Sequence, residues 1–293
     1  MNLHGIYVPL VTPFAEDGTV ALDTLERLAR SVLAEGAAGV VALGTTGEPA
    51  MLSPDEKRQV VDVCARICRE RGATLIVGAG GSDTRQSAAA LAELAGVADV
   101  ALVPVPPYVR PSDEGVLAHF AHLTERSPVP LLIYHIPYRT GQPLGAGILR
   151  QLALMRGVVG AKLATGSVDQ DTVELLGDLP PGFAVLAGED AFLAPLLALG
   201  AAGGILATAH LATARFVELL DDWDKADLEF ARPLGHRLAT LARAVFSEPN
   251  PAVVKAVLAA QGRIPTPAVR LPLLPASEAA TARALDCLAA LDG

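Results

Sequence analysis

Leu131–Gly141 reads L-L-I-Y-H-I-P-Y-R-T-G and Val158–Gly166 reads V-V-G-A-K-L-A-T-G, and this pair of segments decides the fold. Each begins with a short apolar run that ends in a reactive side chain, Tyr134 in the first and Lys162 in the second. Between them, residues 144–155 place apolar side chains at helical spacing. This order predicts two parallel strands joined by a crossover helix. Because adjacent strands lie roughly 4.8 Å apart, the phenol and the amine can meet in one pocket if both point inward.

Lys162 is unusual in a chain that has only four lysines and otherwise uses arginine as its cation. Arginine does not lose its proton in proteins, whereas a desolvated lysine does, and its neutral amine then attacks carbonyl carbons. Lys162 is therefore a candidate Schiff-base nucleophile. The alternative is a lysine at a strand end whose aliphatic part packs while its amine reaches water.

Composition narrows the possible partners. The chain has 293 residues, is 51% hydrophobic and carries a net charge of −9 with no basic run. Nucleic acid and anionic membranes are therefore not expected as partners. The absence of an apolar run of about 18 residues and of a signal-like N-terminal segment predicts a soluble cytoplasmic protein. The six histidines are scattered without ligand spacing, so no metal site is expected.

Strand-like and helix-like segments alternate along residues 1–224. Eight strands are expected, at residues 5–10, 40–43, 74–77, 100–103, 131–134, 158–162, 183–186 and 204–207. This pattern predicts an α/β protein with a (β/α)8 TIM barrel. The alternative, a doubly wound sheet, lacks a glycine fingerprint, since G-A-G-G at residues 78–81 matches neither G-x-G-x-x-G nor a P-loop. Residues 225–293 predict a C-terminal extension of about three helices, suited to a subunit contact or a cap on the barrel.

Three serines mark expected helix starts. Ser53 is followed by Pro54 at the first helical position and Glu56 at the third, the pattern of a capping box. Ser82 and Ser112 are expected to cap the next two helices of the barrel.

The active site of such a barrel forms at the C-terminal ends of the strands. The polar residues expected there are Thr45, Thr46, Tyr108, Tyr134, Arg139, Lys162, Thr165, Glu189 and Asp190. An amine nucleophile beside a phenol that passes protons suits carbinolamine and imine chemistry.

Four of these residues have both a functional and a plain interpretation. Thr45 and Thr46 lie between glycines and offer backbone N–H groups to a carboxylate, or they form only a turn. Arg139 can hold a second carboxylate through two hydrogen bonds, or it makes a surface ion pair. Tyr108, which follows two prolines, can simply pack.

The motifs together resemble those of the dihydrodipicolinate synthase and N-acetylneuraminate lyase family of pyruvate-dependent class I aldolases. The resemblance runs from Gly5 to about Pro275. Its motifs are G-I-Y-V-P-L-V-T-P-F at residues 5–14, G-T-T-G-E at 44–48, Y-H-I-P-Y-R-T-G at 134–141, G-A-K-L-A-T-G at 160–166 and E-P-N-P-x-x-V-K at 248–255. Each motif is weak alone, but their order and spacing together are specific.

The resemblance implies roles for the central residues. Lys162 would form the Schiff base with pyruvate, with no other cofactor, and Tyr134 would be the acid and base. Thr45 and Tyr108 would complete a proton relay with Tyr134, Tyr108 reaching into a neighbouring subunit's site. Thr45 and Thr46 would bind the pyruvate carboxylate.

The resemblance also implies the second substrate and the assembly. Arg139, in the context Y-x-x-P-x-R-T-G, resembles the synthase branch, in which it binds the carboxylate of aspartate semialdehyde. Apart from the resemblance, Leu206 and Glu189 are also expected to contact substrate, and Glu189 with Asp190 could bind sugar hydroxyls. The partners implied are a keto acid and an aldehyde, and the implied assembly is a homotetramer built as a dimer of dimers.

The chain departs from the synthase pattern at three positions near the site. Leu163 stands where synthases usually carry an acidic residue, His135 where they carry asparagine, and Tyr138 where the residue is small. Three hypotheses therefore remain: a synthase that condenses pyruvate with aspartate semialdehyde, a retro-aldolase or dehydratase of a 2-keto-3-deoxy sugar acid or related keto acid, and a non-catalytic barrel that binds a keto acid. Pro54, Lys57 and Pro107 replace residues typical of lysine-inhibited synthases, so strong inhibition by lysine is not expected.

Overall fold

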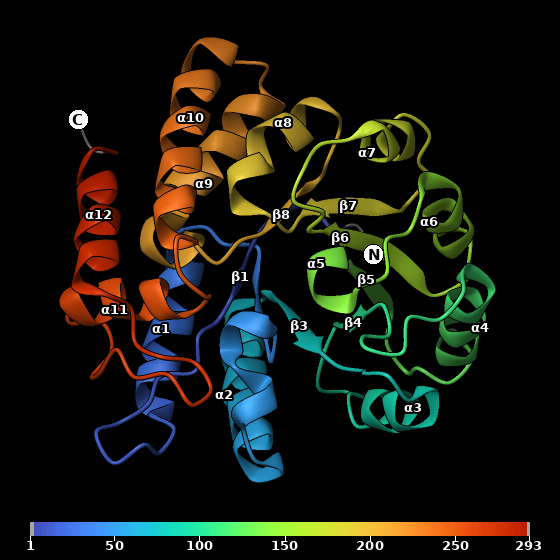
Figure 1. Ribbon diagram of the computed structural model, residues 1–293, viewed down its shortest axis with the longest axis horizontal. Coiled ribbons are helices and arrows are strands. Elements are labelled where there is room, and N and C mark those ends of the chain that lie inside the picture. The colour runs from blue at the N-terminus through green and yellow to red at the C-terminus, as the bar shows by residue number, and fades with distance from the viewer. Residues whose placement is uncertain (1–2, 292–293) are drawn as a thin grey trace. The chain divides into compact units, whose positions relative to one another are not determined.

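The computed structural model describes residues 3–291, in which eight parallel strands close into a barrel in the order β1 to β8 (Figure 1). The strands are β1 (Gly5–Pro9), β2 (Gly39–Ala42), β3 (Thr74–Gly78), β4 (Val100–Pro104), β5 (Leu131–His135), β6 (Val158–Leu163), β7 (Ala184–Ala187) and β8 (Gly203–Ile205). The predicted (β/α)8 barrel is confirmed. The eighth strand is shorter than expected, and Leu206 follows its last residue.

Helices alternate with the strands, as the sequence predicts. They are α1 (Leu22–Ala34), α2 (Pro54–Arg71), α3 (Thr84–Ala92), α4 (Asp113–Thr124), α5 (Pro137–Thr140), α6 (Ala146–Ala153), α7 (Gln170–Leu176), α8 (Leu193–Ala198) and α9 (Ala209–Asp224). The C-terminal extension contains α10 (Leu228–Val245), α11 (Ala252–Ala260) and α12 (Glu278–Ala289), which confirms its predicted helices. None of the helices within residues 3–291 has both the length and the apolar content needed to cross a membrane.

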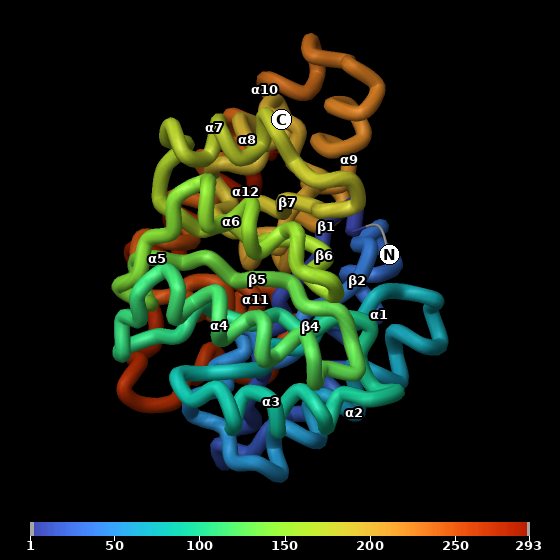
Figure 2. The backbone as a smooth tube through the Cα atoms, turned by 90° about the vertical axis from the view of Figure 1, so that its right-hand side faces the viewer, coloured from blue at the N-terminus to red at the C-terminus, as the bar shows by residue number. Residues whose placement is uncertain are grey.

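The chain forms two compact units. The first consists of Ile76–Ile205 with the chain up to Gly5. In it, α3, α4, α6 and α7 run along the outer side of β4–β7 (Figures 1 and 2). The strands of this unit read as continuous apolar runs, as expected when both faces of a parallel sheet are covered. The predicted division of the chain at residue 224 stays a prediction.

The second unit consists of Ile6–Leu75 with the chain from Leu206 onward. In it β1 pairs with β2, α1 packs on α2, and α10 packs between α9 and α12 (Figure 1). Helix α10 buries a continuous apolar stripe that includes Leu234, Leu238 and Leu241. The extension is therefore part of this unit's core, as its helical periodicity implies.

Two of the three predicted helix caps are confirmed. Ser53 accepts the Glu56 N–H while the Glu56 carboxylate accepts the Ser53 N–H, which completes the capping box of α2. Ser112 caps α4 by accepting the Gly115 N–H. The prediction for Ser82 was wrong, because the adjacent Asp83 caps α3 and its carboxylate accepts two backbone N–H groups.

Candidate active site

Tyr134 and Lys162 face each other across two neighbouring strands. In the register of β5 and β6 they are direct partners, and each is the last residue but one of its strand. The Lys162 Nζ atom lies 4.4 Å from the centre of the Tyr134 ring. The predicted meeting of amine and phenol ring near the strand ends is therefore confirmed, and the register produces it.

Lys162 is buried, and no counterion pairs with it within residues 3–291. Only 7% of the residue is exposed, and none of the ion pairs within residues 3–291 includes it. A lysine whose amine reached bulk water would be more exposed. The interpretation of Lys162 as an ordinary strand-end lysine is therefore not supported.

Gly188, directly after β7, makes room for the lysine. A Cβ atom at this position would lie 2.8 Å from both Cγ and Cε of Lys162 and 2.8 Å from the Leu163 carbonyl oxygen. Real Cβ atoms essentially never approach so closely, so an alanine here requires the lysine or the strand to shift. Sequence reasoning did not assign Gly188 a role, although it placed the next two residues, Glu189 and Asp190, at the site.

Arg139 lies on α5, a four-residue helix that the sequence did not predict. Its guanidinium carbon lies 5.4 Å from the centre of the Tyr138 ring, and both side chains are exposed. Arg139 belongs to none of the ion pairs that the structure records between residues 3 and 291. Its interpretation as one half of a surface ion pair is therefore not supported.

Two other predicted site residues lie on loops of the same unit. Tyr108 follows β4, is 91% exposed and has a left-handed backbone with φ of 68°. Its ring does not pack against the core. The plain interpretation of Tyr108 as a packing residue is therefore not supported. Glu189 follows β7, and its Oε2 atom accepts the Gly166 N–H at 3.2 Å. Glu189 thus ties the loop after β7 to the loop that follows Lys162.

Thr45 and Thr46 belong to the second compact unit, as does Leu206. Thr45 and Thr46 begin a 3₁₀ turn (η1, Thr45–Gly47) shortly after the end of β2, where the first N–H groups lack partners within the turn. Thr46 is buried, and its hydroxyl accepts a 2.9 Å hydrogen bond from the Asn250 amide. Leu206 is fully buried, and its N–H bonds to the Tyr7 carbonyl.

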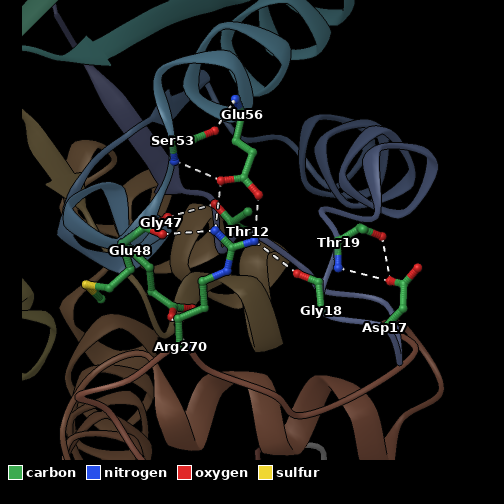
Figure 3. A network of polar contacts seen from close by, with 10 residues as sticks. Thr12, Asp17, Gly18, Thr19, Gly47, Glu48, Ser53, Glu56 and Arg270 are labelled. Atoms are coloured by element: carbon green, nitrogen blue, oxygen red, sulfur yellow. Dashed lines mark hydrogen bonds and ion pairs between the residues drawn. The ribbon is translucent and has the colours of Figure 1, made fainter.

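A buried ion pair holds Glu48, the residue that ends this turn, and Figure 3 shows where Glu48 lies beside Arg270. The Lys255 Nζ atom lies 2.7 Å from Glu48 Oε1, and both side chains are fully buried. The second Glu48 oxygen accepts the Arg270 N–H at 2.9 Å. Lys255 also lies 4.0 Å from the centre of the Phe14 ring. Burial lowers the pKa of Lys255 to about 8, so the ammonium form still predominates at pH 7.

Arg270 extends the network to the start of α2. Its guanidinium donates to both carboxylate oxygens of Glu56 and to the Gly18 carbonyl (Figure 3). The Arg270 guanidinium lowers the pKa of Glu56 to about 2. Glu48 itself has a left-handed backbone with φ of 56°, a conformation that non-glycine residues rarely adopt. Arg270 therefore holds both Glu48, where the backbone is strained, and Glu56 in the first turn of α2.

Sequence reasoning missed the contacts of Asn250 and Lys255. Both residues were present in the E-P-N-P-x-x-V-K motif, but a short motif does not reveal that its lysine lies against Glu48. The available signal was a lysine inside the apolar stretch A-V-V-K-A-V-L, the same signal that singled out Lys162. No group of three or more His, Cys, Asp and Glu residues suited to a metal ion occurs in the part of the chain that the structure describes.

A parallel barrel with a buried, uncompensated lysine against a tyrosine ring at its strand ends has the parts of an imine-forming barrel enzyme. The sequence model of the Dihydrodipicolinate synthetase family matches residues 2–291, and the chain belongs to this family. Its members are class I pyruvate-dependent lyases.

Named relatives cover almost the whole chain. The chain is 37% identical to 4-hydroxy-tetrahydrodipicolinate synthase 2 of Clostridium acetobutylicum, over 95% of this chain and 96% of that protein. It is 35% identical to 4-hydroxy-tetrahydrodipicolinate synthase of Methanothrix thermoacetophila, over 97% and 96% of the two chains. The structure is similar to that of dihydrodipicolinate synthase from Thermotoga maritima, with a TM-score of 0.94, 32% identity and coverage of 100% and 99%.

Proposed function

We propose that the protein condenses pyruvate with L-aspartate 4-semialdehyde through an imine on Lys162. The observation that carries this proposal is the buried Lys162 amine, 4.4 Å from the Tyr134 ring centre and free of ion pairs within residues 3–291. The relatives named as 4-hydroxy-tetrahydrodipicolinate synthases support the choice of reaction. The chemistry needs no metal ion or organic cofactor, because the lysine itself captures the keto acid.

The proposed reaction begins when the Lys162 amine attacks the C2 carbonyl of pyruvate. The carbinolamine that forms loses water to give the imine, and Tyr134 passes the protons that this step requires. Loss of a proton from the pyruvate methyl group gives an enamine, whose carbon attacks the aldehyde. The carbonyl oxygen of the aldehyde takes up a proton as the new carbon–carbon bond forms.

The remaining site residues bind and orient the substrates in this proposal. Thr45 and Thr46 hold the pyruvate carboxylate, and their position in a turn after a strand supports that role. Arg139 holds the carboxylate of the semialdehyde. Glu189 and Leu206, which follow the ends of β7 and β8, complete the substrate contacts.

We propose a homotetramer in the cytoplasm, with Tyr108 serving the site of a neighbouring subunit. The 91% exposure of Tyr108 supports this role, since a phenol that stands off its own protomer is available to another. A monomeric dihydrodipicolinate synthase variant is among the similar structures, with a TM-score of 0.94. A monomer in sedimentation analysis of the purified protein would contradict the proposed homotetramer.

Borohydride trapping tests the proposed imine directly. We expect pyruvate and borohydride together to add a three-carbon mass to the protein, and peptide mapping to place it on Lys162. The exposed Lys225 provides an internal control, since it lies at the protein surface and outside the proposed site. An unmodified Lys162 peptide would refute the mechanism.

Arg139→Ala tests the identity of the aldehyde. We expect kcat/KM for aspartate semialdehyde to fall by roughly 10- to 100-fold, because a hydrogen bond to a charged group is worth roughly 1.5–3 kcal/mol. The yield of the borohydride adduct with pyruvate should not change. Arg85→Ala is the control, since Arg85 is also an exposed arginine of this unit. Unchanged kinetics in Arg139→Ala would exclude the proposed contact.

The second candidate function is cleavage or dehydration of a 2-keto-3-deoxy sugar acid. Tyr138 favours it, because a bulky exposed ring lies beside Arg139 where the synthase pattern has a small residue. Both reactions share Lys162, so trapping does not separate them. Assays with aspartate semialdehyde and with a panel of keto-deoxy acids do.

Feedback control is expected to be weak. Pro54, Lys57 and Pro107 stand where lysine-inhibited synthases are expected to carry His, His and Tyr, so the imidazoles and the phenol of those residues are missing. We therefore expect no half-inhibition by lysine at sub-millimolar concentration in a steady-state assay. Strong inhibition would show that other residues of this chain bind lysine.

A further inference from the structure

A cavity of about 400 Å³ lies on the side of β5 and β6 opposite to Tyr134 and Lys162. Side chains alternate along a strand, so His135 and Leu163, which directly follow the reactive pair, point the other way and line this cavity. Helices α6 and α7 form its outer wall. Its volume falls within the range of about 300–1,000 Å³ that is typical of small-molecule sites.

His135 is the first sign that the cavity is a binding site. The residue is 2% exposed, and its Nδ1 atom has no hydrogen-bond partner within the described part of the chain. Burial lowers the pKa of His135 to about 4, so the imidazole is neutral at pH 7. Buried polar atoms are nearly always paired, and a polar group in the cavity would supply the missing partner.

Two exposed carboxylates, Asp169 and Asp171, bring negative charge to the lining at the start of α7. Asp169 Oδ1 accepts the Thr172 N–H at 2.9 Å and caps α7, while Asp171 Oδ1 accepts the Ala146 N–H at 3.1 Å. Backbone hydrogen bonds therefore hold both side chains in place at the cavity. The lining includes no lysine or arginine to neutralise them.

The rest of the lining is largely apolar. Four leucines form much of the wall, namely Leu144, Leu149, Leu163 and Leu175. The two carboxylates disfavour keto acids and other anions as occupants. A metal ion is also a poor fit, since no group of three ligand side chains gathers here within residues 3–291.

We propose that this cavity binds a small molecule that carries an ammonium group on a short apolar body. The ammonium lies toward Asp169 and Asp171, the apolar body lies against the leucines, and a polar hydrogen of the occupant bonds to the His135 ring. The site is distinct from the one that captures pyruvate, because Lys162 and Tyr134 lie on the other face of the same strands.

Calorimetric titration without pyruvate tests the proposal, with n-butylammonium as the probe and n-butanol as its neutral match. We expect the ammonium to bind at millimolar concentration and the alcohol to bind at least about tenfold more weakly, the ratio expected for losing one charge-assisted hydrogen bond. Equal binding of the two probes, or no binding of the ammonium, would overturn the proposal.

Variants locate the binding within the cavity. Asp169→Asn with Asp171→Asn keeps a side-chain oxygen to accept each backbone N–H but removes both charges, and we expect it to weaken the binding of n-butylammonium by about tenfold or more. Asp178→Asn on the exposed surface is the control and should not change the affinity. The same loss in the control, or no loss in the double variant, would contradict the assignment.

Two single variants test the same cavity if Asp169→Asn with Asp171→Asn does not fold. Leu149→Phe narrows the cavity from α6 without touching the strands and should weaken the probe, whereas Leu154→Phe, at an exposed position just after the same helix, should not. Full affinity in a folded Leu149→Phe protein would place the probe elsewhere. Because these titrations use no substrate, their failure is distinguishable from failure of the proposed function.

An occupant would touch the residues that follow Tyr134 and Lys162 along their strands. Resting on the proposed function, we expect n-butylammonium to change the rate of imine formation with pyruvate in the parent protein and not in Asp169→Asn with Asp171→Asn. A rate change that persisted in the double variant would instead show binding of the probe at the catalytic lysine.

Discussion

Lys162→Arg is expected to lower kcat/KM for the condensation by at least about 10⁴-fold, a loss typical of removing a covalent nucleophile. The substitution keeps a positive charge and a long side chain, but the guanidinium does not release a proton to become a nucleophile. Steady-state kinetics measure the loss, and borohydride trapping should show no adduct. Circular dichroism and thermal unfolding should show that the barrel still forms.

Lys225→Arg is the matched control, because Lys225 is exposed and follows α9 far along the chain from Lys162. It should keep the activity of the parent protein. If Lys162→Arg kept more than about one hundredth of the activity, general acid–base catalysis alone, which contributes typically 10²–10⁴-fold, would be a sufficient account of the site. The imine mechanism would then be abandoned.

Lys255→Met is expected to lower the free energy of unfolding by about 3–5 kcal/mol, because it leaves the buried Glu48 carboxylate without its cation. Denaturant unfolding followed by circular dichroism measures the change. Lys225→Met at an exposed position is the control and should stay within about 0.5 kcal/mol of the parent. A similar small change in Lys255→Met would show that the ion pair does not stabilise the fold.

The double variant Glu48→Gln with Lys255→Met separates the loss of the pair from the cost of an orphaned charge. Replacing both partners of a buried pair is often close to neutral, so we expect the double variant to recover much of the lost stability. We also expect a raised KM for pyruvate, because Glu48 ends the turn that carries Thr45 and Thr46. If the double variant recovered stability but not KM, the Glu48–Lys255 pair would serve mainly to position the turn that carries Thr45 and Thr46.

The two buried lysines show what sequence reasoning reaches and where it ends. Both Lys162 and Lys255 interrupt apolar segments, and the rarity of lysine in this chain drew attention to the first. The structure shows that their surroundings differ. Lys162 has no ion pair within the described residues, whereas the Lys255 amine lies 2.7 Å from the Glu48 carboxylate. Glu48 and Lys255 are 207 positions apart in the chain, and no local pattern reports a contact at that distance.

Apolar periodicity and capping residues predicted the barrel well, because each strand and helix shows its own periodicity and is bounded by its own capping or turn residues. The register of β5 and β6 then followed from the two segments that end in Tyr134 and Lys162. The cap at Ser82 was wrong because two good capping residues stand side by side, and the Asp83 carboxylate, rather than the hydroxyl, accepts the free N–H groups of α3. The short helix α5 and the cavity beside His135 depend on tertiary packing, which periodicity does not encode.

Gly188 places a constraint on any effort to redesign substrate preference. The atoms that leave space for the reactive lysine belong to the residue after β7, and even a methyl group there would meet both the Lys162 side chain and the backbone of Leu163. Saturation libraries aimed at the neighbouring Glu189 should therefore leave codon 188 unvaried. Otherwise, many inactive clones would reflect a displaced nucleophile rather than the specificity under selection.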